Sequence, residues 1–177
     1  MTGPARGPSP ARLIVVDAYN VIHRTPELKP GPGRTLRESR DKLTNLLSWA
    51  VGTGEAQFLV VFDGSEERGH DERSGRVEVR FSRPPEKADD LIRRIVEQEV
   101  DRVERVTVVT SDLEVARHAR AMGADIALAD LFLASVLGPG RTEADEKPTT
   151  LTKKELAEWA EIFTRRPGAK PANGEDE

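Results

Sequence analysis

The chain has 177 residues, of which 37% are hydrophobic and 33% are charged, and its 27 basic and 31 acidic residues give a net charge of −4. This length corresponds to about one domain with tails, and the absence of Cys excludes disulfides, zinc–thiolate sites and cysteine nucleophiles. The slight acidic excess means that any polyanion must be held by a local basic surface or by bound cations.

Neither membrane insertion nor secretion is indicated. The longest largely apolar stretch, 127–137, contains Asp130 and falls well short of the roughly 20 residues that a spanning helix needs. Residues 1–11 lack the apolar middle of a signal peptide and predict a flexible tail. We therefore expect no membrane association and, most simply, a soluble cytoplasmic protein.

Apolar runs typical of buried strands alternate with amphipathic stretches typical of helices. Buried strands are predicted at 13–16, 58–62 and 106–109, a further strand at 124–129, and a half-buried edge strand at 77–81. Helices are predicted from Thr35 to Ala50, after Pro85, from 110–112 to Gly123, and through Leu137 with Asp130 as the N-cap. The segments 18–33 and 64–75 are polar and turn-rich and predict loops.

The C-terminal part is predicted to carry one separate helix. Residues 138–150 are rich in Gly, Pro and Thr and predict a linker after a domain at 12–137. A capping-box spacing at Thr152 and Glu155 starts a helix over 151–165, with an apolar stripe of Leu156, Trp159, Ile162 and Phe163. We expect this helix to dock on the domain, although a free helix offered to a partner is the alternative. Residues 166–177 predict a disordered tail.

This alternation predicts an α/β fold: a Rossmann-like three-layer sandwich with a mostly parallel central sheet covered on both faces. The first strand is followed by Asp-Ala-Tyr-Asn and not by Gly-x-Gly-x-x-Gly, and the chain has no Walker phosphate loop. No nucleotide cofactor is expected.

Four carboxylates are predicted to converge on one crevice. Asp17, Asp63 and Asp112 follow buried strands, and the carboxyl ends of parallel strands share the sheet edge at which open α/β folds bind ligands. In the helix after Pro85, Asp89 shares its face with apolar residues, whereas Asp90 shares a solvent face with Arg93, Arg94 and Glu97. Asp89 is therefore predicted to point inward.

Four clustered acids require either protonation or a counter-ion, because two unit charges about 4 Å apart repel by roughly 4 kcal/mol at an effective dielectric near 20. An oxygen-only site suits Mg²⁺ or Mn²⁺, and such sites support attack on a phosphoryl group. Taken singly, Asp112 as a helix cap, Asp63 as a turn residue and Asp89 as a helix N-terminal acid are ordinary alternatives. Taken together, the four favour a site.

Four motifs resemble one known family. The first strand runs into Asp-Ala-Tyr-Asn-Val-Ile at 17–22, which resembles the Asp-Gly-Tyr-Asn-Val/Ile-Ile opening of the YacP-like NYN domains, a branch of the PIN-like ribonucleases. Residues 60–64 (Val-Val-Phe-Asp-Gly), 77–82 with Lys-Ala-Asp at 87–89, and Thr-Ser-Asp at 110–112 are similar to later motifs of that family, in the same order. The resemblance covers about 13–137.

The resemblance implies a PIN-like fold and metal-dependent cleavage of RNA, with Asp17, Asp63, Asp89 and Asp112 as catalytic metal ligands. It also links the chain to RNA cleavage at the ribosome, which the sequence itself neither supports nor excludes. Two positions depart from the family pattern: Ala18 replaces a Gly, and Lys87 replaces a Thr. Neither change removes an acid, and Lys87 introduces a cation suited to a phosphate.

Other polar residues are candidates for substrate binding. Asn20 is expected either to orient a carboxylate or contact phosphate, or to act only as a turn residue. Thr110 and Ser111 are candidates to bind phosphate oxygens, with helix capping as the alternative for Ser111. Arg80, in a basic run flanking the edge strand, and Lys87 are candidates to grip phosphates, with an ordinary solvated surface as the alternative.

The sequence therefore predicts a divalent-metal-dependent endoribonuclease whose partner is RNA. The alternative is an RNA- or ribosome-binding adaptor with the same fold and no useful turnover. A phosphohydrolase of dehalogenase type fits poorly, because Tyr19 stands where that mechanism needs a second Asp. The sequence does not define the oligomeric state.

Overall fold

The computed structural model describes residues 12–50, 56–64, 71–132 and 153–164. The predicted tails at 1–11 and 166–177 and the predicted linker at 138–150 lie outside these ranges. The described elements, in chain order, are β1 (Arg12–Asp17), α1 (Ala18–Arg24), α2 (Leu36–Ala50), β2 (Ala56–Phe62), β3 (Glu72–Ser74), β4 (Val77–Phe81), α3 (Ala88–Glu99), β5 (Arg105–Val109), α4 (Leu113–Met122), β6 (Asp125–Ala127) and α6 (Lys153–Thr164).

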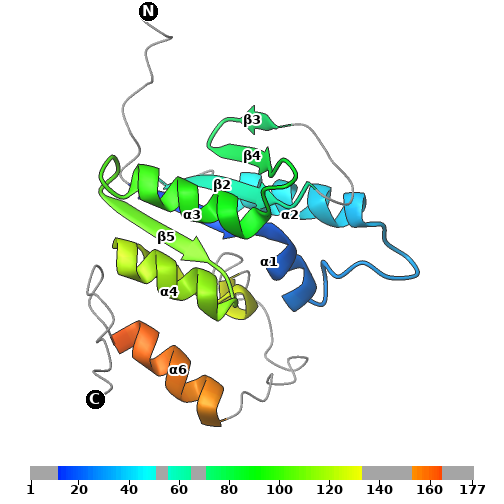
Figure 1. The fold of residues 1–177 in the computed structure, drawn as a ribbon. Helices are drawn as coiled ribbons and strands as arrows, with labels where there is room; N and C mark the ends of the chain where they lie inside the picture. The colour runs from blue at the N-terminus through cyan, green and yellow to red at the C-terminus, as the bar shows by residue number, and fades with distance from the viewer. Residues whose placement is uncertain (1–11, 51–55, 65–70, 133–152, 165–177) are drawn as a thin grey trace, which may run out of the picture.

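The strands form one six-stranded sheet in the order β3-β4-β2-β1-β5-β6 (Figure 1). All neighbouring pairs are parallel except β3 and β4, which pair antiparallel. The first strand in sequence, β1, lies at the centre between β2 and β5, as two crossovers in opposite directions require. The predicted α/β fold with a mostly parallel sheet is confirmed.

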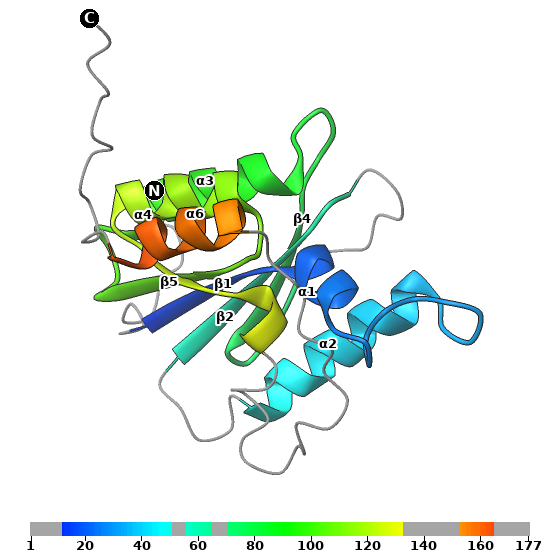
Figure 2. The ribbon, with the colours of Figure 1, turned by 90° about the horizontal axis from the view of Figure 1, so that it is seen from below.

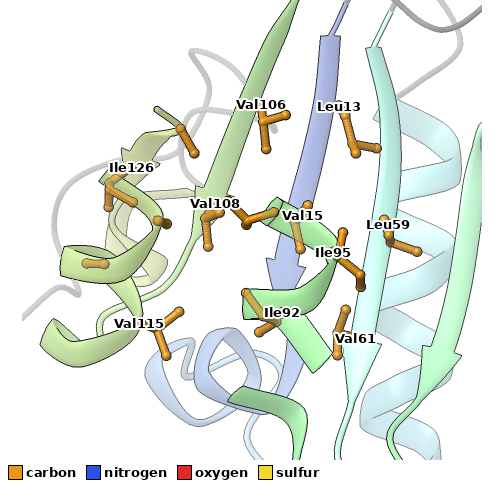
Figure 3. Close-up of a cluster of buried hydrophobic side chains, with 14 of the residues drawn as sticks. Leu13, Val15, Leu59, Val61, Ile92, Ile95, Val106, Val108, Val115 and Ile126 are labelled. Atoms are coloured by element: carbon orange, nitrogen blue, oxygen red, sulfur yellow. The ribbon is translucent and has the colours of Figure 1, made fainter. Parts of the chain in front are cut away.

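Helices cover both faces of the sheet, which makes three layers (Figure 2). On one face, Leu13, Val15 and their neighbours on β2 and β5 pack against α3 and α4, as Figure 3 shows. On the other face, Ile14 and Val16 pack with Val21 of α1 and with apolar residues of α2. Because side chains alternate along a strand, each buried strand contributes to both cores.

The helix boundaries follow local signals in the sequence. Thr35 Oγ1 accepts a hydrogen bond from the backbone N–H of Glu38 at 3.2 Å, which is half of the predicted capping box at the start of α2. Gly123 ends α4 with a φ of 108°, in the left-handed region that glycine adopts most easily. Both predicted boundaries are confirmed.

Three expectations about local structure were wrong. The segment 18–33 was expected to be a loop, but its first part is α1, whose Ala18, Val21 and Ile22 are buried. The segment 64–75 was also expected to be a loop, but it contains β3. Because β3 pairs with the outer side of β4, β4 is not the edge strand that its alternating pattern predicted.

Within α6, the described side chains contact α4. Glu158 pairs with Arg117 at 3.6 Å, and Ile162 is buried in the same core cluster as Val115. The side chains of Leu156, Trp159 and Phe163, the rest of the predicted stripe, lie outside the described set. Across the described helices, no segment is both long enough and apolar enough to cross a membrane.

The packing of α1 can be tested on two adjacent residues. Ile22 is fully buried, whereas His23 is exposed. We expect Ile22→Ala to lower the free energy of unfolding by about 2–5 kcal/mol, because it removes buried methyl groups and leaves a cavity. The control His23→Ala should change the free energy of unfolding by less than about 0.5 kcal/mol. Urea unfolding measures both values, and equal effects would mean that α1 does not pack as described.

Candidate active site

The candidate site lies at the carboxyl edge of the sheet, between the starts of α3 and α4. Asp17 is the last residue of β1 and stands opposite Val61 of β2, so both point to the face covered by α3 and α4. Asp63 follows β2 directly, and Asp112 precedes α4. Asp89 lies in the first turn of α3. The topology therefore brings to this edge the four acids that the sequence singled out.

Asp17 is the buried centre of this group, with 7% of its surface exposed. The fully buried Thr110, directly after β5, donates a hydrogen bond from Oγ1 to Asp17 Oδ2 at 3.0 Å. The same Oγ1 accepts a hydrogen bond from the backbone N–H of Asp112 at 3.0 Å. Thr110 therefore links the buried carboxylate of Asp17 to Asp112, the residue that precedes α4. Both hydrogen bonds of the Thr110 hydroxyl are made to protein atoms.

Burial raises the pKa of Asp17 from 3.8 to about 7. The hydrogen bond from Thr110 lowers it, the negative charges of Asp89 and Asp112 raise it further, and the backbone amide of Asn20 lowers it. The balance of these effects shows that the protein supplies too few donors to compensate for the lost solvation of this carboxylate.

Asp89 belongs to the same charge cluster. Burial raises its pKa, the charges of Asp112, Asp90 and Asp63 raise it further, and the charge of Arg93 lowers it. Asp90 is exposed and accepts a hydrogen bond from the backbone N–H of Lys87 at 3.1 Å. Of the two neighbouring acids, Asp89 is the one whose carboxylate is desolvated.

Arg93 was expected on the solvent face with Asp90, but its side chain is only 37% exposed and its Nη2 lies 4.0 Å from Glu114 Oε2 on α4. Its guanidinium therefore sits between α3 and α4, where its charge acts on Asp89. The spacing of Asp89 and Arg93, four residues apart on one helix, was the signal for this interaction.

Asp63 and Asp112 also serve as helix caps. Asp63 Oδ2 accepts a hydrogen bond from the backbone N–H of Ala88, at the start of α3, at 3.3 Å. Asp112 Oδ1 accepts from the backbone N–H groups of Glu114 and Val115, at 2.9 and 3.5 Å. The capping interpretation of Asp112 is therefore correct, and it does not exclude a site role, because each cap bond uses one carboxylate oxygen.

The backbone after Asp63 is fixed by a close approach to β4. Gly64 N–H donates to Ser82 Oγ at 3.1 Å, and Ser82 is fully buried. A Cβ on Gly64 would overlap the carbonyl oxygen of Ser82. Glycine is therefore needed at this position for steric reasons.

Asn20 and Ser111 contact each other. Asn20 Oδ1 accepts a hydrogen bond from the Ser111 backbone N–H at 2.6 Å. Ser111 Oγ donates to Asp130 Oδ1 at 3.1 Å and accepts from the Ala129 backbone N–H at 3.2 Å. Ser111 thus caps the helical residues 129–132, where Asp130 was expected to be the cap.

Asp130 was not predicted to belong to the site. It is nevertheless a further acid at the same sheet edge, because it follows β6. Besides the bond from Ser111, it pairs with Arg24 of α1 at 3.5 Å. Its partners lie 19 and 106 residues away in the chain, so only the fold could reveal them.

The two predicted cationic residues have different surroundings. Arg80 Nε donates to Glu78 Oε1 at 2.8 Å, so its charge is already paired beside β4. Lys87 is exposed at the start of α3, and the exposed Arg83 precedes it in the connection from β4. Lys87 and Arg83 are therefore both more exposed than Arg80.

The chemistry of the donors fits a hard divalent cation, because the four carboxylates supply only oxygen and repel one another without a counter-ion. As the side chains stand in the described ranges, no three Asp, Glu or His residues are grouped to hold one ion directly. Mg²⁺ keeps several of its waters when bound, so the acids of a Mg²⁺ site need not all contact the ion directly.

Comparison with known proteins defines the class. The family model of the YacP-like NYN domain matches residues 14–162, and the chain belongs to this family, whose fold is that of the PIN-like nucleases. The match continues past 137 and into α6, so it extends beyond the region where the motifs resemble the family.

Similar proteins are found in Bacillus subtilis. The protein YacP of strain 168 is 29% identical over 102 residues, which cover 56% of this chain and 60% of YacP. The chain thus spans less than two thirds of that relative. The crystal structure of Rae1 (YacP) has a TM-score of 0.61 at 28% identity, covering 71% of this chain and 73% of that one. A point mutant of Rae1 gives the same TM-score at 27% identity, covering 71% and 74%.

Replacement of Asp17 tests the cost of burying its carboxylate. Because the pKa is raised from 3.8 to about 7, the folded chain binds this proton more tightly than the unfolded chain, and the folded state loses stability as pH rises between those values. Without metal, we expect Asp17→Asn to raise the free energy of unfolding by up to about 4 kcal/mol at about pH 8 and by little near pH 4. Urea unfolding in EDTA measures this.

The matched control is Asp101→Asn, which changes an exposed acid after α3 and should alter the free energy of unfolding by less than about 0.5 kcal/mol at either pH. If Asp17→Asn raised the free energy of unfolding by the same amount at both pH values, the raised pKa of Asp17 would be contradicted.

Gly64→Ala tests the close approach to β4. The added methyl group must displace the Ser82 carbonyl or the residue after Asp63, so we expect a loss of about 1–3 kcal/mol in the free energy of unfolding. Gly33→Ala is a control, because a Cβ at Gly33 meets no atom within 4 Å. Equal melting temperatures for the two variants would show that the approach is looser than described.

Proposed function

We propose that the chain is a divalent-metal-dependent endoribonuclease that cleaves RNA phosphodiester bonds with Mg²⁺ or Mn²⁺. The observation that supports this most strongly is the buried carboxylate of Asp17, whose pKa is raised to about 7, chiefly by burial and further by the charges of Asp89 and Asp112. Strongly perturbed acids clustered at a ligand-binding sheet edge are typical of catalytic sites. Membership of a family with a PIN-like nuclease fold supports the same reaction class.

Asp17, Asp63, Asp89 and Asp112 would hold the cation. A divalent cation held by these residues would neutralise their charge and would supply stabilisation of negative charge on the phosphoryl group. The caps on α3 and α4 are made by Asp63 Oδ2 and Asp112 Oδ1, so capping and cation binding can draw on the same two side chains. Binding requires Asp17 to be ionised, so metal affinity should rise with pH through about 7.

The protein's own groups would orient the carboxylates and the RNA. Thr110 fixes the rotation of the Asp17 carboxylate by donating to Oδ2. The first turns of α3 and α4 present the positive ends of two helix dipoles to the crevice. Lys87, at the start of α3, and Arg83, after β4, are exposed and would bind phosphates that flank the cleaved one.

A second candidate is an RNA- or ribosome-binding adaptor without turnover. It is favoured by the absence, among the described residues, of three acidic or His side chains grouped to bind one ion. The capping bonds of Asp63 and Asp112 also give these acids a structural role of their own.

The nuclease and the adaptor are distinguished by whether the chain cleaves RNA. We expect the purified chain to cleave RNA with MgCl₂ or MnCl₂, EDTA to stop the reaction, and Asp17→Asn to lower the rate by about 10²-fold or more, as loss of a group that acts in the reaction does. Asp101→Asn should cleave like the wild type, and circular dichroism checks that both variants fold. Comparison of naked RNA with ribosome-bound RNA tests whether the ribosome is a partner.

Gel-shift binding completes the test. If the wild type and Asp17→Asn bind RNA equally, and neither cleaves naked or ribosome-bound RNA, the nuclease proposal is wrong and the adaptor stands.

A further inference from the structure

Ser111 is the junction of a hydrogen-bond network beside the carboxylates. Its backbone N–H donates to Asn20 Oδ1 at 2.6 Å. Its hydroxyl donates to Asp130 Oδ1 at 3.1 Å and accepts from the Ala129 N–H at 3.2 Å. Both donors of Ser111 are therefore used within the protein, and none is left for a substrate phosphate.

The network joins three segments that follow neighbouring strands. Asn20 follows β1, Ser111 follows β5, and Asp130 follows β6, and these strands are adjacent in the sheet. Arg24 Nη1 adds a contact from the end of α1 to Asp130 Oδ2 at 3.5 Å. Each oxygen of Asp130 thus has a partner, Ser111 on one side and Arg24 on the other.

The position of Ser111 bears directly on the carboxylates. It lies between Thr110, whose Oγ1 holds Asp17, and Asp112, whose backbone N–H donates to that same Oγ1. If the Ser111 backbone moves, the hydroxyl of Thr110 and the start of α4 move with it. The bonds to Ser111 therefore act on a segment whose Thr110 hydroxyl contacts both Asp17 and the backbone of Asp112.

We infer that Asp130 is a positioning residue of the proposed nuclease: through its hydrogen bond to Ser111 it holds the 110–112 segment, and with it the Thr110 hydroxyl, in the geometry that sets Asp17. This inference rests on the proposed function. It gives Asp130 no contact with RNA or metal, and it gives Ser111 and Asn20 the same positioning role.

The test compares variants that keep or remove the bond to Ser111. Asp130→Ala removes the acceptor, and we expect kcat to fall about tenfold with KM within about twofold, as for loss of an interaction that acts on the chemical step. Asp130→Asn keeps an oxygen that can accept from Ser111, and it should recover most of kcat. Arg24→Gln, which removes only a partly exposed ion pair, should have a small effect.

A double-mutant cycle tests the route. If Asp130 acts through Ser111, then Ser111→Ala should lower kcat to a similar extent, and the double variant Ser111→Ala/Asp130→Ala should lose no more than the worse single variant. Losses that multiply would overturn the route through Ser111. Glu99→Ala, which breaks an ion pair with Arg102 at the far end of α3, is the control for loss of a surface carboxylate.

A readout independent of cleavage is hydrogen exchange of the Ser111 and Asp112 backbone amides, followed by NMR. In Asp130→Ala, exchange of both should speed up about tenfold relative to the wild type, as expected when one hydrogen bond that holds the segment is lost. In Asp130→Asn and Glu99→Ala it should stay near the wild-type rate.

The outcomes separate the inference from the proposed function. If the wild type cleaves RNA and Asp130→Ala matches it, the inference is wrong. If Asp130→Asn is as impaired as Asp130→Ala and needs more MgCl₂, Asp130 is a metal ligand and the inference is also wrong. If the wild type does not cleave but the exchange pattern holds, the nuclease proposal falls while the positioning of 110–112 by Asp130 stands.

Discussion

Burial of the Asp17 carboxylate is the constraint on which the rest of the site depends. Asp17 ends β1, which lies between β2 and β5, and its backbone pairs with Val61 of β2, so the backbone cannot move toward solvent without disturbing that pairing. The compensation it receives, chiefly the Thr110 hydroxyl and a backbone amide, leaves its pKa near 7. The protein thus maintains a buried carboxyl group that needs either a proton or a nearby cation to be stable near neutral pH. A sheet edge used only for packing would gain nothing from this arrangement.

The side chains of the neighbouring acids Asp63 and Asp112 both cap helices and contribute negative charge to the crevice. Asp63, which follows β2, accepts a hydrogen bond from the first turn of α3, and Asp112 caps α4, the helix that it precedes. Each acid therefore stabilises a helix N-terminus through one carboxylate oxygen. These bonds also bring the two helix N-termini to the crevice, where their dipoles favour negative charge. The helices on this face are consequently anchored by the acids whose mutual repulsion would otherwise push the edge apart.

Much of this could be predicted from sequence because strand ends and helix faces are local properties. The apolar runs located the strands, and the acids after them located the edge. The helix α1 was missed because only Ala18, Val21 and Ile22 are buried in a segment that otherwise reads as polar. The strand β3 was missed because its residues are all exposed and only its pairing with β4 defines it. The contacts of Asp130 were missed because tertiary structure alone creates them.

The two sides of the crevice differ in which polar groups are already hydrogen-bonded within the protein, and this difference suits them to different roles. On the side of α1, β5 and β6, the amide oxygen of Asn20 and the hydroxyls of Thr110 and Ser111 are engaged by protein atoms. On the side of β4 and α3, Lys87 and Arg83 are exposed. Groups that are fully bonded can hold geometry but cannot bind a phosphate, whereas exposed cations can bind phosphate but hold little geometry. In the proposed reaction, an RNA strand would therefore be bound from the α3 side, while the carboxylates are held in place from the α1 side.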